Sequence, residues 1–145
     1  MKTLAISIFI LVTGVSFSQS KVSFFKRVNS SRMVERGIEQ YNFGGTSDAY
    51  MTFKQACAYN PYSSKAFYYL ATFEFELNSY YEAESHVTSA LRFADKKMSS
   101  DVHLLAGQIH HNLNHLDSAV YHYQFCTELL GEKTAKEFGL QTLIE

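Results

Sequence analysis

A repeat of about 34 residues is the feature of this sequence that most restricts its fold. Small residues recur in three columns, and each column advances by 34 residues and then by 36. The columns are Gly37, Ala71 and Gly107; Ala49, Ala83 and Ala119; and Ala56, Ala90 and Cys126, with Pro61, Asp95 and Gly131 closing the units at the same interval. Four columns that share one period indicate three copies of one structural unit, and periods of roughly 20–50 residues are typical of stacked repeats.

The stretch 64–95 shows what each unit contains. Residues at helical spacing give one apolar face to a first helix (Phe67, Leu70, Ala71 and Phe75) and one to a second (Ala83, Val87, Ala90 and Leu91). Asn78 and Ser79 separate the two, and the small side chains of Ala71 and Ala83 favour a close antiparallel helix hairpin. A single hairpin cannot bury its apolar face alone, so we expect the three units to stack on one another.

This pattern resembles the tetratricopeptide repeat, whose signature over 34 residues is W-x-x-L-G-x-x-Y, A-x-x-x-F, A and P. The resemblance covers roughly residues 30–133. The chain departs from the signature at the Trp position (Met33, Phe67 and His103) and at the Tyr position (Gln40, Glu74 and His110), and only Pro61 keeps the closing proline. The resemblance implies an all-α fold: an α-solenoid of three antiparallel helix hairpins, at 30–63, 64–97 and 100–133, with a C-terminal capping helix.

The turn residues predict where the helices begin and end. Helices are expected over 30–43, 46–59, 100–114 and 116–130, with the two helices of 64–95 between them. The expected N-caps are Ser30, Ser63 or Ser64, and Ser100 with Asp101, and Gly131 is the expected C-terminal stop. Residues 134–145 are expected to form the capping helix or to begin a truncated fourth repeat.

The N-terminal residues 1–18 have the character of a signal peptide. An apolar run over 4–17 follows Lys2, and Ser16 and Ser18 are the small residues that a signal peptidase needs, so we expect cleavage before Gln19. The run is short for a membrane span, although an uncleaved anchor or a buried helix remains an alternative. The prediction is an exported protein, periplasmic, associated with the cell envelope or secreted, with no integral membrane span after cleavage.

Residues 19–29 are expected to be a short leader. Phe24 and Phe25 in it could pack against the first hairpin, or the segment could be a strand or a docking segment for a partner. The signal type, the Gln19 start and the tyrosine-rich repeats also look like the N-terminal repeat portions of OmpA-like cell-envelope proteins of the Bacteroidota.

Charge and cysteine content narrow the possible partners. The formal net charge is −1, so neither nucleic acid nor an anionic membrane surface is an expected partner. Cys57 and Cys126 fall on the second helices of the first and third units, too far apart for the ~7 Å between Cα atoms that a disulfide allows. Both are therefore expected to pack as small core residues.

In the tetratricopeptide family the first helices of the hairpins line a concave groove that takes an extended peptide or a partner's helix. By this resemblance the groove residues are Val34, Ile38, Tyr41 and Asn42; Lys65, Tyr68, Thr72, Phe75 and Glu76; and Asp101, Leu104, Gln108, His111 and Asn112. Tyr41, Phe75 and His111 share one column, and their rings either bind a partner or pack between repeats. Lys65 is the one cation among these residues, so recognition of an acidic C-terminal tail is not expected.

Metal binding and catalysis have weaker support. His111 and His115 are spaced i, i+4, which zinc can use, but no acidic or Cys residue falls at a matching position, so no metal ligand and no cofactor are assigned. The pairs Glu74 and Glu76, and Glu82 and Glu84, are expected on a solvated face, and no nucleophile motif or phosphate loop is present, so the chain is not expected to be an enzyme. The prediction is a scaffold or adaptor that binds a protein or peptide; the alternatives are a histidine-based periplasmic metal binder and a self-associating structural module.

Overall fold

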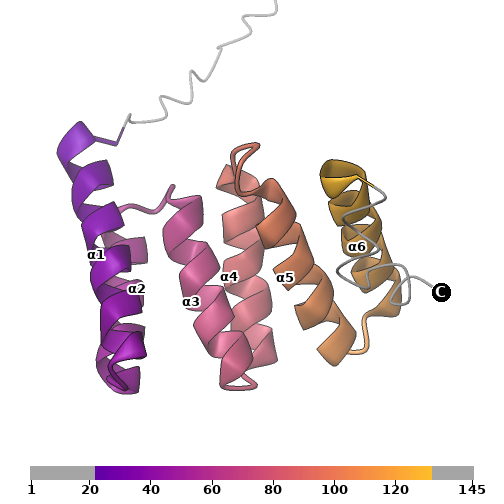
Figure 1. Ribbon diagram of the computed structural model, residues 1–145, viewed down its shortest axis with the longest axis horizontal. Coiled ribbons are helices and arrows are strands. Elements are labelled where there is room, and N and C mark those ends of the chain that lie inside the picture. The colour runs from indigo at the N-terminus through magenta and orange to yellow at the C-terminus, as the bar shows by residue number, and fades with distance from the viewer. Residues whose placement is uncertain (1–21, 132–145) are drawn as a thin grey trace, which may run out of the picture.

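The computed structural model describes residues 22–131, which form six helices in three antiparallel hairpins (Figure 1). The helices are α1 (Phe24–Asn42), α2 (Thr46–Tyr59), α3 (Ser64–Glu76), α4 (Tyr80–Phe93), α5 (Ser99–Asn112) and α6 (Leu116–Leu130). The three hairpins of the predicted all-α solenoid are therefore confirmed. The predicted signal peptide (1–18) and the predicted C-terminal capping helix (134–145) lie outside the described residues.

Two helix starts differ from the prediction. Helix α1 begins at Phe24 and not near Ser30, and Phe24 and Phe25 are 66% and 74% exposed, so they do not pack against the first hairpin as expected. Helix α5 begins at Ser99, so the predicted cap at Ser100 is also wrong. The turn before α5 is held by Asp95, whose Oδ1 accepts hydrogen bonds from the backbone N–H groups of residues 97 and 98 at 3.1 and 3.0 Å.

The other boundaries follow the turn residues. Helices α2 and α6 begin and end where the sequence predicts, and Ser63 caps α3 by accepting a hydrogen bond from the backbone N–H of Ala66 at 3.2 Å. Gly131 ends α6 with a φ of +81°, a conformation that favours glycine.

Ser30 has a different role from the predicted cap. It is buried within α1, and its hydroxyl donates to the carbonyl of Ala56 at 3.1 Å. Ser64, the first residue of α3, repeats this bond to the carbonyl of Ala90 at 2.9 Å. In the third hairpin the direction reverses, since the thiol of Cys126 lies 3.5 Å from the carbonyl of Ser100. One bond between the two helices therefore recurs at the same place in all three units.

Where the two helices of a hairpin meet, residue volumes compensate one another. A Cβ added to Gly107 would lie 2.4 Å from Cε1 of Tyr123, and one added to Gly37 would lie 2.6 Å from Cε1 of Phe53. The second hairpin has Ala71 and Val87 in these columns, and both are fully buried in one apolar cluster. A glycine therefore faces each aromatic ring, whereas an alanine faces the smaller valine.

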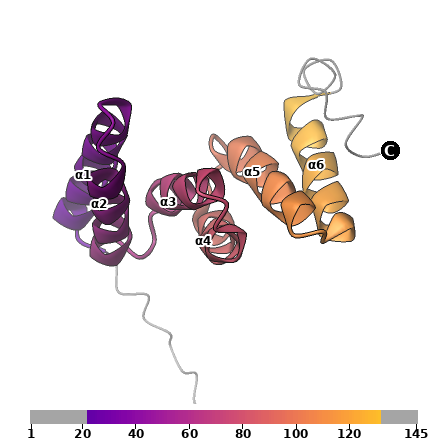
Figure 2. The ribbon, with the colours of Figure 1, turned by 90° about the horizontal axis from the view of Figure 1, so that it is seen from below.

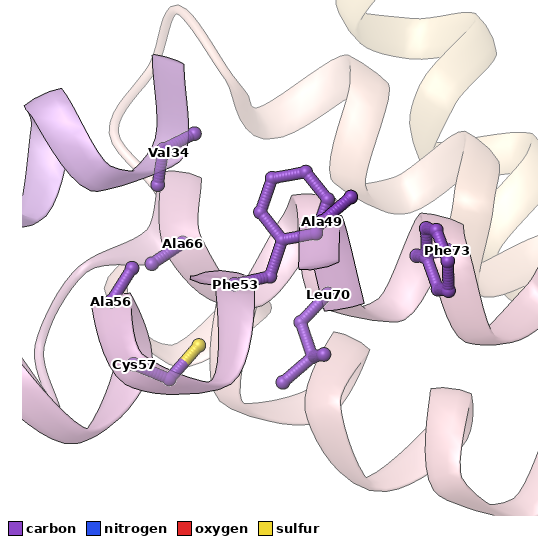
Figure 3. Packing of buried hydrophobic residues seen from close by; sticks show 8 residues of the cluster. All are labelled: Val34, Ala49, Phe53, Ala56, Cys57, Ala66, Leu70 and Phe73. Atoms are coloured by element: carbon purple, nitrogen blue, oxygen red, sulfur yellow. The ribbon is translucent and has the colours of Figure 1, made fainter. Parts of the chain in front are cut away.

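The apolar core runs from one hairpin into the next. Figure 3 shows the first cluster, in which side chains of α1 and α2 pack with those of α3. Its buried members are Val34, Ala49, Phe53, Ala56, Cys57, Ala66, Leu70 and Phe73. Cys57 and Cys126 are free and buried in separate clusters, as the sequence predicts, and burial raises the pKa of the Cys57 thiol to about 12.

The stacking assigns different faces to the first and second helices. Over residues 22–131, α1 contacts α3 and α3 contacts α5, whereas α2, α4 and α6 do not contact one another. The first helices therefore lie closer together and form the inner side of the curved array (Figure 2). None of the helices in this described part combines the length and the apolar character that a membrane span requires.

Candidate functional site

A depression lies on the inner side, between α3 and α5. Its volume is about 260 Å³, and it is lined by Tyr68, Thr72, Phe75, Glu76, Asp101, Leu104, Leu105 and Gln108. All of these except Leu105 are residues that the repeat register places in the groove. Pockets that enclose small molecules measure ~300–1,000 Å³, so this depression, which we call the α3–α5 groove, has room for one or two side chains of a partner.

The α3–α5 groove combines aromatic rings with negative charge. Tyr68 and Phe75 are half-buried, and each packs against the second core cluster. Glu76 and Asp101 are exposed, and no Lys, Arg or His belongs to the lining. Burial, and next the negative charge of Asp101, raise the pKa of the Tyr68 phenol. Tyr68 therefore stays a neutral ring beside a carboxylate at physiological pH.

Tyr41 does not line the groove but contacts Glu76, which does. Its hydroxyl donates a 2.6 Å hydrogen bond to Oε2 of Glu76, and this bond raises the pKa of Tyr41. Its ring packs edge-on against Phe73, with the ring centroids 5.6 Å apart. Tyr41 therefore links the first hairpin to the second, next to the Glu76 carboxylate.

The remaining predicted groove residues are dispersed. Val34 is fully buried in the first cluster, so its assignment to the groove surface is wrong, and Ile38 packs against that cluster. Lys65 is half-buried and pairs with Glu35, with 3.7 Å between Nζ and Oε1. Three polar residues are exposed outside the lining: Asn42, His111 and Asn112. The predicted strip Tyr41–Phe75–His111 thus contributes only Phe75 to the depression.

Comparisons with known proteins support the same architecture. No family model matches the sequence, and no curated protein matches it. Among solved structures, the Arabidopsis OM64 TPR domain is 19% identical, with a TM-score of 0.70, over 81% of this chain and 96% of that one. The chain has the tetratricopeptide-repeat fold.

Two further structures with this repeat fold were solved with peptides. The Yersinia enterocolitica type III secretion chaperone SycD, in complex with a peptide of the translocator YopD, is 17% identical with a TM-score of 0.69, over 81% of this chain and 90% of that one. The second TPR domain of human RPAP3, in complex with the HSP70 peptide SGPTIEEVD, is 18% identical with a TM-score of 0.70, over 83% and 98%. The TM-scores establish a shared fold and, at these low identities, nothing further.

The tyrosine position of the tetratricopeptide repeat is used differently here. In each hairpin the residue at this position contacts a polar residue of the second helix. Gln40 accepts a hydrogen bond from the hydroxyl of Thr52 at 2.7 Å, and Oε2 of Glu74 lies 2.6 Å from Nδ1 of His86. In the third hairpin the ring of His110 stacks on that of His122, with 5.3 Å between the ring centroids. Each pair is separated by 12 residues along the sequence. That recurrent offset is the signal by which the sequence could have revealed the pairs.

The burial of Glu74 shows that one prediction is wrong. It was expected on a solvated face, but only 2% of its surface is exposed. Its Oε1 accepts a hydrogen bond from the hydroxyl of Tyr50 at 3.3 Å, while its Oε2 faces His86. The carboxylate therefore joins α2, α3 and α4 inside the molecule.

The histidines of the third hairpin pack on one another and do not form the i, i+4 pair that zinc could use. Helix α5 ends at Asn112, so His111 and His115 do not share one helical face. His103 and His122 meet instead, with 2.9 Å between their Nδ1 atoms. Burial, and then the neighbouring imidazoles, lower the pKa of His122 to about 4. His122 is therefore a neutral, packed side chain at physiological pH.

Proposed function

We propose that this tetratricopeptide-repeat domain is a scaffold or adaptor, and not an enzyme, that binds a peptide segment of a partner protein in the α3–α5 groove. The observation that carries the proposal is the groove itself: half-buried rings beside exposed carboxylates, on the inner side of the array. Aromatic side chains offer a large rigid contact area with few rotatable bonds and are enriched at interfaces. The peptide-bound SycD and RPAP3 structures support the use of this fold for peptides.

The negative charge of the groove favours basic peptides over acidic ones. Glu76 and Asp101 would repel an acidic tail such as the HSP70 peptide bound by RPAP3, whereas they attract Lys or Arg. Lys65, the one cation that the repeat register places on this face, already pairs with Glu35. We therefore expect a peptide with one apolar anchor for the depression and at least one basic residue close to it.

Selection from a random-peptide phage library tests this proposal. Peptides enriched on the purified chain should carry an apolar residue next to Lys or Arg, and their affinity should fall with added salt because exposed charges are screened. The double variant Glu76→Gln, Asp101→Asn should bind them at least about tenfold more weakly, since charge pairs at an interface contribute on the order of 1.5 kcal/mol or more.

A charge-matched control separates the groove from general attraction. Asp117→Asn with Glu128→Gln removes the same charge from two exposed residues of α6 that do not line the groove. This control should bind the selected peptides as the wild type does. Enrichment of acidic peptides, or equal losses in the two double variants, would contradict the proposal.

We also propose that the domain acts outside the cytoplasm, in the periplasm or cell envelope. The support is the sequence of residues 1–18, with its apolar run and the small residues Ser16 and Ser18. N-terminal sequencing of the mature protein from a bacterial host should begin at Gln19, and Ser18→Tyr should leave the precursor uncleaved. A mature protein that still begins at Met1 would contradict export by cleavage.

A further inference from the structure

Three side chains with metal-binding atoms converge where the second hairpin meets the third. Glu84 comes from α4, His110 from the last turn of α5, and His115 from the residue just before α6. Oε1 of Glu84 lies 3.3 Å from Nδ1 of His110 and also 3.3 Å from Nδ1 of His115. The three ligand atoms all lie within 4.8 Å of one another.

The hairpin turn holds the two histidines together. The backbone N–H of His115 donates to the carbonyl of His110 at 2.8 Å, and Asn114 between them has a φ of +60° that reverses the chain. The second hairpin has the same turn, with Ser79 N–H donating to the carbonyl of Glu74 at 2.9 Å and Asn78 at φ +59°. The backbone thus fixes these two positions next to each other in both units, and the third unit places an imidazole at each.

The distances match the edges of a small coordination polyhedron. Zinc binds imidazole nitrogen and carboxylate oxygen at about 2.0–2.2 Å, so two ligand atoms in a tetrahedral site are separated by about 3.3–3.5 Å. The two separations of 3.3 Å from Oε1 of Glu84 agree with this value. Two of the three separations are therefore already those of a tetrahedral site, and the two histidine nitrogens lie within 4.8 Å of each other.

The state of His110 is a second, independent observation. Its Nδ1 atom is fully buried, yet within the described residues it has no hydrogen-bond partner, because its approach to Glu84 lacks hydrogen-bond geometry. An orphaned buried polar atom is rare and calls for an explanation. The ring is held in place by stacking on His122, with 5.3 Å between centroids and 3° between planes. The Nδ1 atom of His110 is thus held close to Glu84 and His115 without a hydrogen-bond partner among the described residues.

We propose that Glu84, His110 and His115 form a zinc-binding site that ties the second repeat to the third. Two imidazoles and one carboxylate suit zinc, and three protein ligands leave a fourth position for water or an exogenous ligand. His115 has a half-exposed side chain, which gives the ion a path from solvent. Because the ligands come from α4, from α5 and from the turn before α6, bound zinc stabilises the packing of the last two hairpins.

Zinc titration of the chain, purified without a histidine tag, tests the site. Calorimetry should show one Zn²⁺ per chain with a dissociation constant below about 10 μM, equivalent to ~7 kcal/mol. Glu84→Gln and His115→Ala should each weaken binding at least about tenfold, as loss of a ligand does. Zinc should raise the melting temperature of the wild type and raise it much less in either variant.

His111→Ala is the matched control. His111 is an exposed histidine at the same end of α5 but is not part of the cluster, so its loss should change zinc affinity by less than about twofold, a small effect beside loss of a ligand. Circular dichroism with EDTA present checks that each variant is folded. If His115→Ala does not fold, the comparison is made with Glu84→Gln instead. Binding weaker than about 10 μM (~7 kcal/mol), or equal losses in His111→Ala and His115→Ala, would overturn the proposal.

Discussion

Replacing His86 with leucine is expected to lower the free energy of unfolding by about 3 kcal/mol, the lower end of the usual cost of leaving a buried charged group without its partner, because Glu74 is buried and His86 is partly exposed. Glu74 is 2% exposed, and its Oε2 lies 2.6 Å from Nδ1 of His86. Leucine keeps most of the apolar volume that stacks against Phe67 but removes the ring nitrogen. The carboxylate would then keep one hydrogen bond, from the Tyr50 hydroxyl at 3.3 Å. Urea denaturation of the two proteins measures the difference.

A double-mutant cycle identifies the cause of that loss. Glu74→Leu combined with His86→Leu should be more stable than His86→Leu alone, because replacing both partners by apolar groups leaves no buried charge without a partner. Glu74→Gln keeps the shape and an acceptor oxygen, so it should cost less than His86→Leu. If the effects of the two leucine substitutions simply add, Glu74 and His86 are not coupled and this account of Glu74 is wrong.

Gly107→Ala is expected to destabilise the chain by about 1–3 kcal/mol, the usual cost of overpacking a core. The result would be unusual, because Gly→Ala inside a helix normally gains ~1 kcal/mol from helix propensity. Here the new Cβ would lie 2.4 Å from Cε1 of Tyr123, which is 2% exposed, so the buried ring or the helix would have to shift. Thermal or chemical unfolding of the single variant gives the sign directly.

The second hairpin indicates which second substitution should relieve this clash. It carries Ala71 and Val87 in the columns of Gly107 and Tyr123. Gly107→Ala should therefore be neutral or stabilising when Tyr123→Val is already present, although Tyr123→Val alone costs stability by removing a buried ring. A Gly107→Ala effect that is the same in both backgrounds would contradict the proposed volume compensation.

Most of the predicted fold followed from the repeat period. Columns of small residues define where helices cross, so the hairpins and the boundaries of α2 and α6 follow from spacing and turn residues. The start of α1 could not be predicted in this way, because residues 24–29 belong to none of the repeat columns. The helix continues through them although residues 24–27 are exposed, since no glycine or proline interrupts the segment.

The repeat period also predicted one part of the candidate sites and missed another. The repeat register predicted most of the α3–α5 groove lining, because position along a first helix fixes which side faces inward. Val34 is in the same column as Tyr68 and Leu104, which line the groove, but it is fully buried in the first cluster, so its column alone did not predict its exposure. The contacts of Glu74 and Glu84 do not follow from the periodicity of their own helices, since their partners lie in other helices. Only the offset of 12 residues that the three hairpins share points to the Glu74–His86 pair.

The most direct test of the proposed groove measures affinity and folding stability on the same variant. Phe75→Ala should raise the dissociation constant of a selected peptide about 30-fold, equivalent to ~2 kcal/mol for an aromatic anchor. Phe93→Ala is the control, because Phe93 is also half-buried and also packs against one tyrosine ring. The ring centroids of Phe93 and Tyr62 are 5.3 Å apart, and those of Phe75 and Tyr80 are 5.6 Å apart. Fluorescence anisotropy well below both melting temperatures should show weak binding for Phe75→Ala and unchanged binding for Phe93→Ala. Unchanged peptide affinity in a folded Phe75→Ala variant would contradict the groove as the binding site.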